Sequence, residues 1–179
     1  MRLILPNVLV EIDPAYGPLL FLAGPIRGGG DWQKKCCEFL QWHYDRPFYA
    51  IVPCRWGATH PLHGFAAEGK SDAFERQLSW ERHYLNLAAK KGCLLFWLPC
   101  ESATEPHPGP EPYAMDTRGE LGEWRGRMMH DPALRVVVGA ESGFHGLSQI
   151  QRNFNEALRC QFPIHATMQE TVRAALAKL

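Results

Sequence analysis

Two glutamates occupy positions at which a carboxylate could do chemistry. Glu120 lies between Gly119 and Gly122 in the stretch "MDTRGELGEW" (115–124), at the predicted first turn of a helix. Each glycine lowers helix propensity by up to about 1 kcal/mol, and its compensating gain would be close approach of the backbone to a ligand. Thr117 three residues before Glu120 also gives the spacing of a capping box, and this spacing alone favours the cap.

The second glutamate lies on an otherwise apolar stripe of a predicted helix over 72–92. The members of the stripe recur at steps of four and three: Phe74, Leu78, Glu81, Leu85 and Ala88. A carboxylate on an apolar face must be paired, hydrogen-bonded or protonated, and a raised pKa suits a general acid near neutral pH. A buried pair with an arginine or tyrosine, or a place at the edge of the stripe, is an equally weighted structural alternative.

Together the two carboxylates suggest retaining chemistry at an anomeric carbon. This chemistry uses one ionised carboxylate and one that exchanges a proton, in different environments. We expect the helix N-terminus to keep Glu120 ionised, so that it attacks the sugar carbon and forms a covalent intermediate. Glu81 would then manage proton transfer to the leaving group.

The elements that must position these residues follow from an alternation of apolar runs and helical patterns. Strands are predicted over 19–24, 48–54, 93–99 and 134–140, and helices over 31–44, 72–92, 117–129, 148–160 and 167–179. The strand runs are continuous, as in parallel sheets covered on both faces. Asp72 and Glu75 have the spacing of a capping box. The first dozen residues could add an edge strand, with Pro6 as a limit. We predict one α/β domain over residues 1–179, a parallel sheet flanked by helices.

In such sheets the ligand crevice lies beyond the carboxyl ends of the strands, so segments 24–30, 53–63 and 99–117 should converge there. The first belongs to "AGPIRGGGDW" (23–32), which has neither the Lys-Ser/Thr of a P-loop nor GxGxxG spacing. Arg27 could hold a phosphate or be an ordinary exposed loop arginine. Trp32 could stack on a ligand, although core packing is the commoner role at a helix start. The long loop 99–117 suggests a lid.

Composition narrows the class of partner. Nineteen basic and nineteen acidic residues cancel without a basic stripe, which favours a small molecule over a nucleic-acid polymer. The six cysteines fall mostly in apolar segments and are expected to be reduced. Cys54, His60 and His63 lack a fourth ligand at zinc spacing, so no metal is expected. No segment has the length of apolar residues that crosses a bilayer, and we expect a cytoplasmic protein without a membrane partner.

Five short motifs carry a family resemblance. In chain order they are "FLAGPI" (21–26), "FERQLSWE" (74–81), "LLFWLP" (94–99), "TRGELGEW" (117–124) and "VVVGA" (136–140). They resemble the nucleoside 2-deoxyribosyltransferase-like family over residues 20 to about 178. The resemblance implies a flavodoxin-like or Rossmann-like fold and a role in nucleotide salvage. The implied reaction cleaves the N-glycosidic bond of a deoxynucleoside and transfers the sugar to a free nucleobase, without a cofactor.

The resemblance also implies roles for individual residues. Glu120 matches the family nucleophile, and Glu81 matches a helical acid that is usually aspartate. The family often has an aspartate six residues before the nucleophile, where this chain has Ala114. The expected substrate-binding residues are Ala23, Gly24, Pro25, Arg27, Trp32, Asp116 and Thr117.

Three further expectations remain open. The "PIRGGG" loop also resembles the phosphate-binding loop of 2'-deoxynucleoside 5'-monophosphate N-glycosidases, in which water accepts the sugar. A noncatalytic nucleotide-binding module with the same fold is a second alternative. Members of the family are commonly homo-oligomers whose sites a neighbouring chain completes, and six tryptophans and nine phenylalanines could supply an apolar interface.

Overall fold

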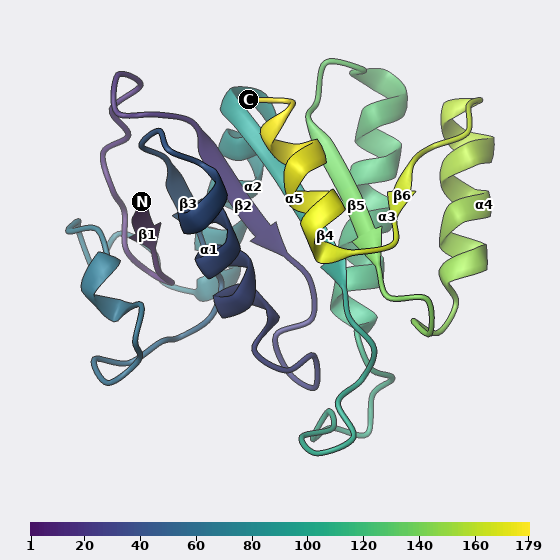
Figure 1. Cartoon of the computed structure of the whole chain (residues 1–179), viewed down its shortest axis with the longest axis horizontal. Helices are drawn as coiled ribbons and strands as arrows, with labels where there is room; N and C mark the ends of the chain where they lie inside the picture. The colour runs from purple at the N-terminus through teal and green to yellow at the C-terminus, as the bar shows by residue number, and fades with distance from the viewer.

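Six parallel strands form one sheet between two layers of helices in the computed structural model, which describes residues 1–179 (Figure 1). The strands are β1 (Arg2–Ile4), β2 (Leu19–Ala23), β3 (Tyr49–Ile51), β4 (Gly92–Leu98), β5 (Val136–Ala140) and β6 (Ile164–His165). Their order across the sheet is β1-β3-β2-β4-β5-β6. The sheet order reverses direction beside β2, so the chain is wound to both sides as in flavodoxin-like folds. The predicted α/β fold class is confirmed.

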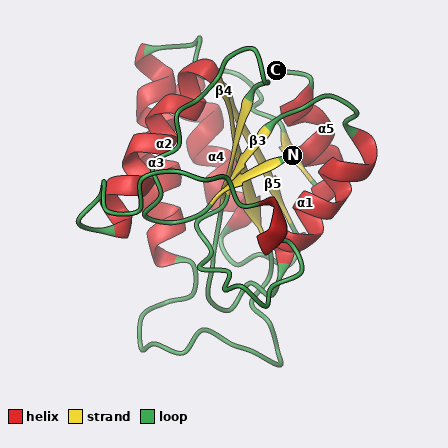
Figure 2. Ribbon diagram, turned by 90° about the vertical axis from the view of Figure 1, so that its left-hand side faces the viewer, coloured by secondary structure: helices red, strands yellow, loops and turns green.

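Five α-helices cover the sheet. They are α1 (Trp32–His43), α2 (Gln77–Lys91), α3 (Met115–His130), α4 (Leu147–Leu158) and α5 (Met168–Leu176), with a short 3₁₀ turn over His63–Phe65. Helices α1 and α5 lie on one face, whereas α2, α3 and α4 lie on the other (Figures 1 and 2). The carboxyl ends of the strands and the long loop after β4 lie together at one end of the molecule, at the bottom of Figure 1.

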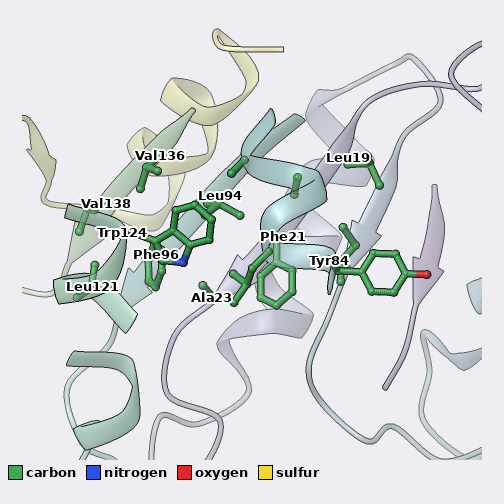
Figure 3. Packing of buried hydrophobic residues seen from close by; sticks show 14 of the residues in the cluster. Leu19, Phe21, Ala23, Tyr84, Leu94, Phe96, Leu121, Trp124, Val136 and Val138 are labelled. Carbon is green, nitrogen blue, oxygen red and sulfur yellow. The ribbon is translucent and has the colours of Figure 1, made fainter. Parts of the chain in front are cut away.

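The two faces of the sheet bury two separate apolar cores. Alternate residues of β2 point to opposite faces, so Phe21 packs toward α2 while Leu22 packs toward α1. Figure 3 shows the first core, in which Phe96 of β4 lies beside Trp124 of α3. Every residue of β2, β4 and β5 is buried or lines a core, which explains why their apolar runs are continuous.

The predicted helix over 72–92 is wrong in its start and in the first half of its inner face. Helix α2 begins at Gln77 after an extended Arg76 without a side-chain cap, so Asp72 and Glu75 form no capping box. Leu78 is 51% exposed, and Trp80 and Tyr84 are buried in its place, whereas Leu85 and Ala88 are buried as predicted.

Contacts with the N-terminal segment explain this rotation of α2. The indole of Trp80 donates to the carbonyl of Val8 at 3.0 Å, and the hydroxyl of Tyr84 donates to the same carbonyl at 3.3 Å. The Tyr84 hydroxyl also accepts from the backbone of Val10 at 2.9 Å. Because both polar tips are satisfied, two large aromatic residues can be fully buried and fix the inward face.

The edges of the sheet agree partly with the sequence. β1 is the predicted edge strand, and it ends before Pro6 as expected of a strand limited by proline. β6 at the opposite edge has two residues and was not predicted. No helix has the length and apolar character to cross a membrane.

The cysteines pack largely as the sequence predicts. All six are free, and four of them, Cys36, Cys37, Cys54 and Cys93, are buried in the core under α1 and α5. Burial raises the pKa of Cys36, Cys54 and Cys93 to about 12. These thiols therefore stay neutral and behave as small apolar side chains.

Candidate active site

A cleft of about 500 Å³ opens beyond the carboxyl end of β2. Its lining includes eight residues singled out from the sequence: Ala23, Gly24, Pro25, Arg27, Glu81, Asp116, Thr117 and Glu120. Segments 24–30 and 99–117 both contribute, as predicted, but segment 53–63 supplies only Pro53. The cleft therefore brings together the first glycine-rich loop, one residue of α2 and the start of α3.

Glu120 lies in the second turn of α3 and not in the first. The helix begins at Met115, directly after Ala114, whose φ of 60° is left-handed. Thr117 is consequently inside the first turn and makes no capping bond, so the predicted capping box with Glu120 is wrong. Helix α3 begins earlier than predicted because the left-handed backbone of Ala114 turns the chain directly into the helix, so that no side-chain cap is needed. Glu120 therefore forms no capping hydrogen bond, and its side chain lines the cleft.

Burial raises the pKa of Glu120 from 4.5 to about 7, with smaller contributions from the negative charges of Glu81, Asp116 and Glu123. The expectation that the helix N-terminus keeps Glu120 ionised is therefore wrong. The helix field falls off within the first turn, and Glu120 lies one turn further on. Desolvation of its charged form dominates.

Glu81 has a raised pKa as well, and the causes differ. Burial of its half-exposed side chain raises the pKa, and so does the charge of Asp116. A hydrogen bond from Gln77 and the positive charge of Arg55 act in the opposite direction. The structure therefore places two carboxyl groups with perturbed pKa values from two helices in one cleft.

The two glutamates are accessible from two sides. Both line the main cleft and also a side groove of about 70 Å³ between α2 and α3. Arg127 of α3 donates a hydrogen bond to Asn86 of α2 and so bridges the two helices along this groove. Glu81 and Glu120 stand where the two cavities meet.

The glycine-rich loop is held tightly against the end of the sheet. Gly24 has a φ of 151°, and a Cβ atom there would lie 2.3 Å from the carbonyl oxygen of Trp97. The indole of Trp32 donates to the carbonyl of Pro25 at 2.8 Å. Trp32 is 3% exposed and is not part of the cleft lining, in contrast to its expected contact with substrate. It supports the loop from beneath.

The long loop between β4 and α3 forms one wall of the cleft and is anchored at several points. Ser102 donates its backbone N–H to the carbonyl of Gly28 at 2.6 Å. The Tyr113 hydroxyl donates to the carbonyl of Pro99 at 2.9 Å and so closes the loop at its base. Glu141, after β5, accepts from the backbone of Cys100 at 2.7 Å.

Sequence reasoning missed several residues of this site. His107 and Glu111 of the long loop line the cleft, with Nε2 of His107 4.0 Å from Oε2 of Glu111. No periodicity marks them, because loop residues follow none. Gln77 was visible four residues before Glu81 in "FERQLSWE", a spacing at which helical side chains meet.

A second cavity of about 990 Å³ lies at the opposite end of the sheet, around the start of β5 and the ends of α4 and α5. It is larger, but its lining is mostly apolar and contains no carboxylate. The smaller cleft is therefore the candidate active site, because it combines concavity with perturbed titratable groups.

No group of three or more histidine, cysteine, aspartate or glutamate side chains is arranged to hold a metal ion. The chain matches no model of a known protein family, and a comparison with curated proteins finds no relative either.

Proposed function

We propose that this chain is a nucleoside 2-deoxyribosyltransferase, as the motif resemblance implies. It would cleave the N-glycosidic bond of a 2'-deoxynucleoside and transfer the sugar to another nucleobase. One observation carries the proposal: Glu120 and Glu81, both with raised pKa values, line one cleft at the carboxyl end of the sheet. Two carboxyl groups in one cavity are the apparatus of retaining glycosyl chemistry.

The protonation of the pair suits this reaction. Glu81 and Glu120 interact, so their protons are lost in two steps that belong to the pair. Between these steps the pair holds one proton, which lies mainly on Glu120 because its pKa is raised to about 7. The reactive state, with Glu120 ionised as the nucleophile and Glu81 protonated as the acid, holds the same single proton on the other carboxyl group. Both arrangements of this proton are lost above about pH 7.

The bonds change as follows in the proposed reaction. A carboxylate oxygen of Glu120 attacks the anomeric carbon, the bond from that carbon to the base nitrogen breaks, and its electron pair stays on the base. Glu81 supplies the proton that neutralises the base. In the second half a nitrogen of the incoming base attacks the same carbon, the bond to Glu120 breaks, and the proton released by the incoming base returns to Glu81.

The cleft has a suitable size and lining for a nucleoside. Its volume of about 500 Å³ lies within the range of small-molecule sites. Phe21, Ile26 and Met115 offer apolar surface for a base, while Asp116 and Thr117 offer oxygen atoms that can bond hydroxyl groups.

A second candidate function is hydrolysis of 2'-deoxynucleoside 5'-monophosphates. Arg27 favours it, because this exposed arginine lines the cleft and takes part in none of the ion pairs of the chain. An unpaired arginine beside a glycine-rich loop is suited to bind a phosphate. A noncatalytic nucleotide-binding module is the remaining alternative, and it would show no turnover.

The test incubates the protein with deoxynucleosides and their 5'-monophosphates, with and without a second free base, and follows all products by liquid chromatography. A new deoxynucleoside formed only with the second base supports transfer. Free base with free sugar or sugar phosphate, independent of the second base, supports hydrolysis. No turnover of any substrate contradicts both enzyme proposals.

The same assay tests the nucleophile. Glu120→Gln removes the attacking oxyanion and should lower kcat by at least about a thousandfold, with the fold intact. Glu156→Gln is the matched control, since Glu156 pairs with Arg152 on the exposed face of α4, away from the cleft. A Glu120→Gln variant as active as Glu156→Gln would rule out the covalent mechanism.

We also propose that the chain forms homo-oligomers, as the resemblance implies. The aromatic residues give little support, because only Trp42 and Phe65 among the tryptophans and phenylalanines are exposed. The apolar surface near the site is aliphatic instead: Ile26, Leu78 and Met115 are 42%, 51% and 49% exposed. Light scattering at micromolar concentration tests the proposal, and a monomer would contradict it.

A further inference from the structure

A chain of hydrogen bonds reaches Glu81 from outside the cleft. Gln77 lies one turn before Glu81 on α2 and donates from its Nε2 atom to Oε1 of Glu81 at 2.8 Å. The same nitrogen donates to the carbonyl of Pro53 at 2.9 Å. On the other side, Arg55 donates from Nε to Oε1 of Gln77 at 2.7 Å. Both the oxygen and the NH₂ group of the Gln77 amide therefore have hydrogen-bond partners.

The partners of Gln77 determine which way its amide faces. The guanidinium of Arg55 can only donate, and the carbonyl of Pro53 can only accept. Only one orientation of the amide satisfies both, with the oxygen toward Arg55 and the NH₂ group toward Pro53 and Glu81. The donor that faces Glu81 is therefore fixed by the chemistry of two neighbours.

This orientation makes the two oxygens of Glu81 different. Oε1 of Glu81 accepts a hydrogen bond from the NH₂ group of Gln77. A proton on Oε1 that pointed toward Gln77 would meet another donor, so Oε1 stays unprotonated on that side. When Glu81 is protonated, the proton belongs on Oε2. A carboxyl group whose proton sits on one defined oxygen has one hydrogen-bond direction, which is what proton transfer to a bound base requires.

We propose that Gln77, itself held by Arg55 and Pro53, is a positioning residue that confines the exchangeable proton of Glu81 to Oε2. The proposal rests on the proposed function, in which Glu81 exchanges a proton with the base. Gln77 does not touch the reacting atoms, since it is not part of the lining of the cleft. It acts through Glu81.

Other charged groups also act on Glu81 and must be considered in any titration. Those near it are Arg55 after β3, Asp116 and Glu120 on α3 and, along the side groove, Arg82, Glu123 and Arg127. Glu120 is coupled to Glu81, because the charge of Glu81 is one cause of the raised pKa of Glu120. A titration of Glu81 is therefore best followed in Glu120→Gln, where the coupling is absent.

The first experiment needs no substrate. The side-chain carboxyl carbon of Glu81 is titrated by ¹³C NMR in Glu120→Gln with and without Gln77→Met, a substitution of similar volume without a donor. Gln77 stabilises the ionised carboxylate, so its loss should raise the pKa of Glu81. Gln149→Met is the matched control, because Gln149 donates to Asn153 four residues on, at 2.7 Å, on exposed α4. An unchanged titration in Gln77→Met would overturn the proposal.

The second experiment measures rates against pH with the otherwise wild-type chain. Gln77→Met should lower kcat roughly tenfold, the effect of one hydrogen bond to a charged group, with little change in KM. In Gln77→Met, the alkaline limb of the plot of kcat against pH should move to higher pH, whereas Gln149→Met should keep the wild-type profile. A purely structural role would lower the denaturant midpoint without moving the limb, and this result would also overturn the proposal.

Arg55→Leu is the second variant if Gln77→Met fails to fold. It removes an exposed side chain and leaves the glutamine amide without its fixed orientation. It should move the titration of Glu81 in the same direction. If the wild-type chain turns over no nucleoside or nucleotide, the proposed function fails and the role in proton exchange fails with it. The NMR titration would still decide whether Gln77 holds Glu81.

Discussion

Glu81 and Glu120 lie on different helices but line the same two cavities, and the negative charge of Glu81 is one cause of the raised pKa of Glu120. The relationship is reciprocal, because whatever removes a proton from one carboxyl group makes the other hold its proton more firmly. The predicted pH dependence of activity follows from this coupling.

The first prediction concerns the pH dependence of activity. With one proton required on the pair, kcat/KM should fall as the pH rises above about 7, where Glu120 and Glu81 are both ionised in the free protein. It should also fall at low pH, where both are protonated. Initial rates between pH 4.5 and 9 with subsaturating deoxynucleoside test this, and a kcat/KM that keeps rising above pH 8 would contradict it.

The second prediction concerns stability and needs no substrate. Between pH 4.5 and about 7, the folded chain keeps a proton on Glu120 that the unfolded chain has already released. The contribution of Glu120 to the free energy of unfolding therefore falls as the pH rises through this window. Discounted for solvent screening, this loss amounts to roughly 2 kcal/mol.

Glu120→Gln isolates this contribution. The stability of Glu120→Gln relative to wild type should increase by the same amount between pH 4.5 and 8. Urea unfolding at several pH values measures it. A difference between the two proteins that does not change with pH would show that burial has not raised the pKa of Glu120.

A third prediction concerns Gly119. A Cβ atom added there would meet nothing within 4 Å, so the folded chain has no packing reason for this glycine. Gly119→Ala should stabilise the chain by about 0.5 to 1 kcal/mol through helix propensity. Gly139→Ala is the contrast, because its Cβ would lie 1.8 Å from Oγ1 of Thr171. Denaturant midpoints of both variants test the difference, and a destabilised Gly119→Ala would point to a contact made only in an assembly.

A fourth prediction concerns Ala114, which adopts a left-handed conformation at the start of α3. This conformation is strained for alanine and unstrained for glycine. Ala114→Gly should therefore stabilise the chain by up to about 1 kcal/mol. Ala174→Gly in α5 should destabilise it by a similar amount, since that alanine is in an ordinary helix. Equal losses of stability in the two variants would contradict the left-handed geometry.

The sequence predicted the order and type of most elements because continuous apolar runs and helical periodicity are local signals. It predicted the start of α5 well for the same reason. Thr167 and Glu170 form a reciprocal capping box within four residues of chain. The same spacing misled the prediction at α2 and α3, where no side chain caps the helix.

The starts of α2 and α3 depend on distant contacts that the sequence does not display. Val8 and Val10 fix the inner face of α2 through Trp80 and Tyr84, although about seventy residues separate them. The candidate carboxylates were found because each broke a local pattern. The pKa of Glu120 could not be predicted, because it depends on burial by residues from several elements.

The anchored loop between β4 and α3 has a consequence for the thermodynamics of binding. A free loop of this length would lose conformational entropy each time a ligand ordered it. Here Tyr113, Ser102 and Glu141 restrict the loop in the absence of ligand. That entropy is lost once, when the chain folds, so a ligand that fits this wall should associate without a slow ordering step and without the entropic cost of ordering the loop.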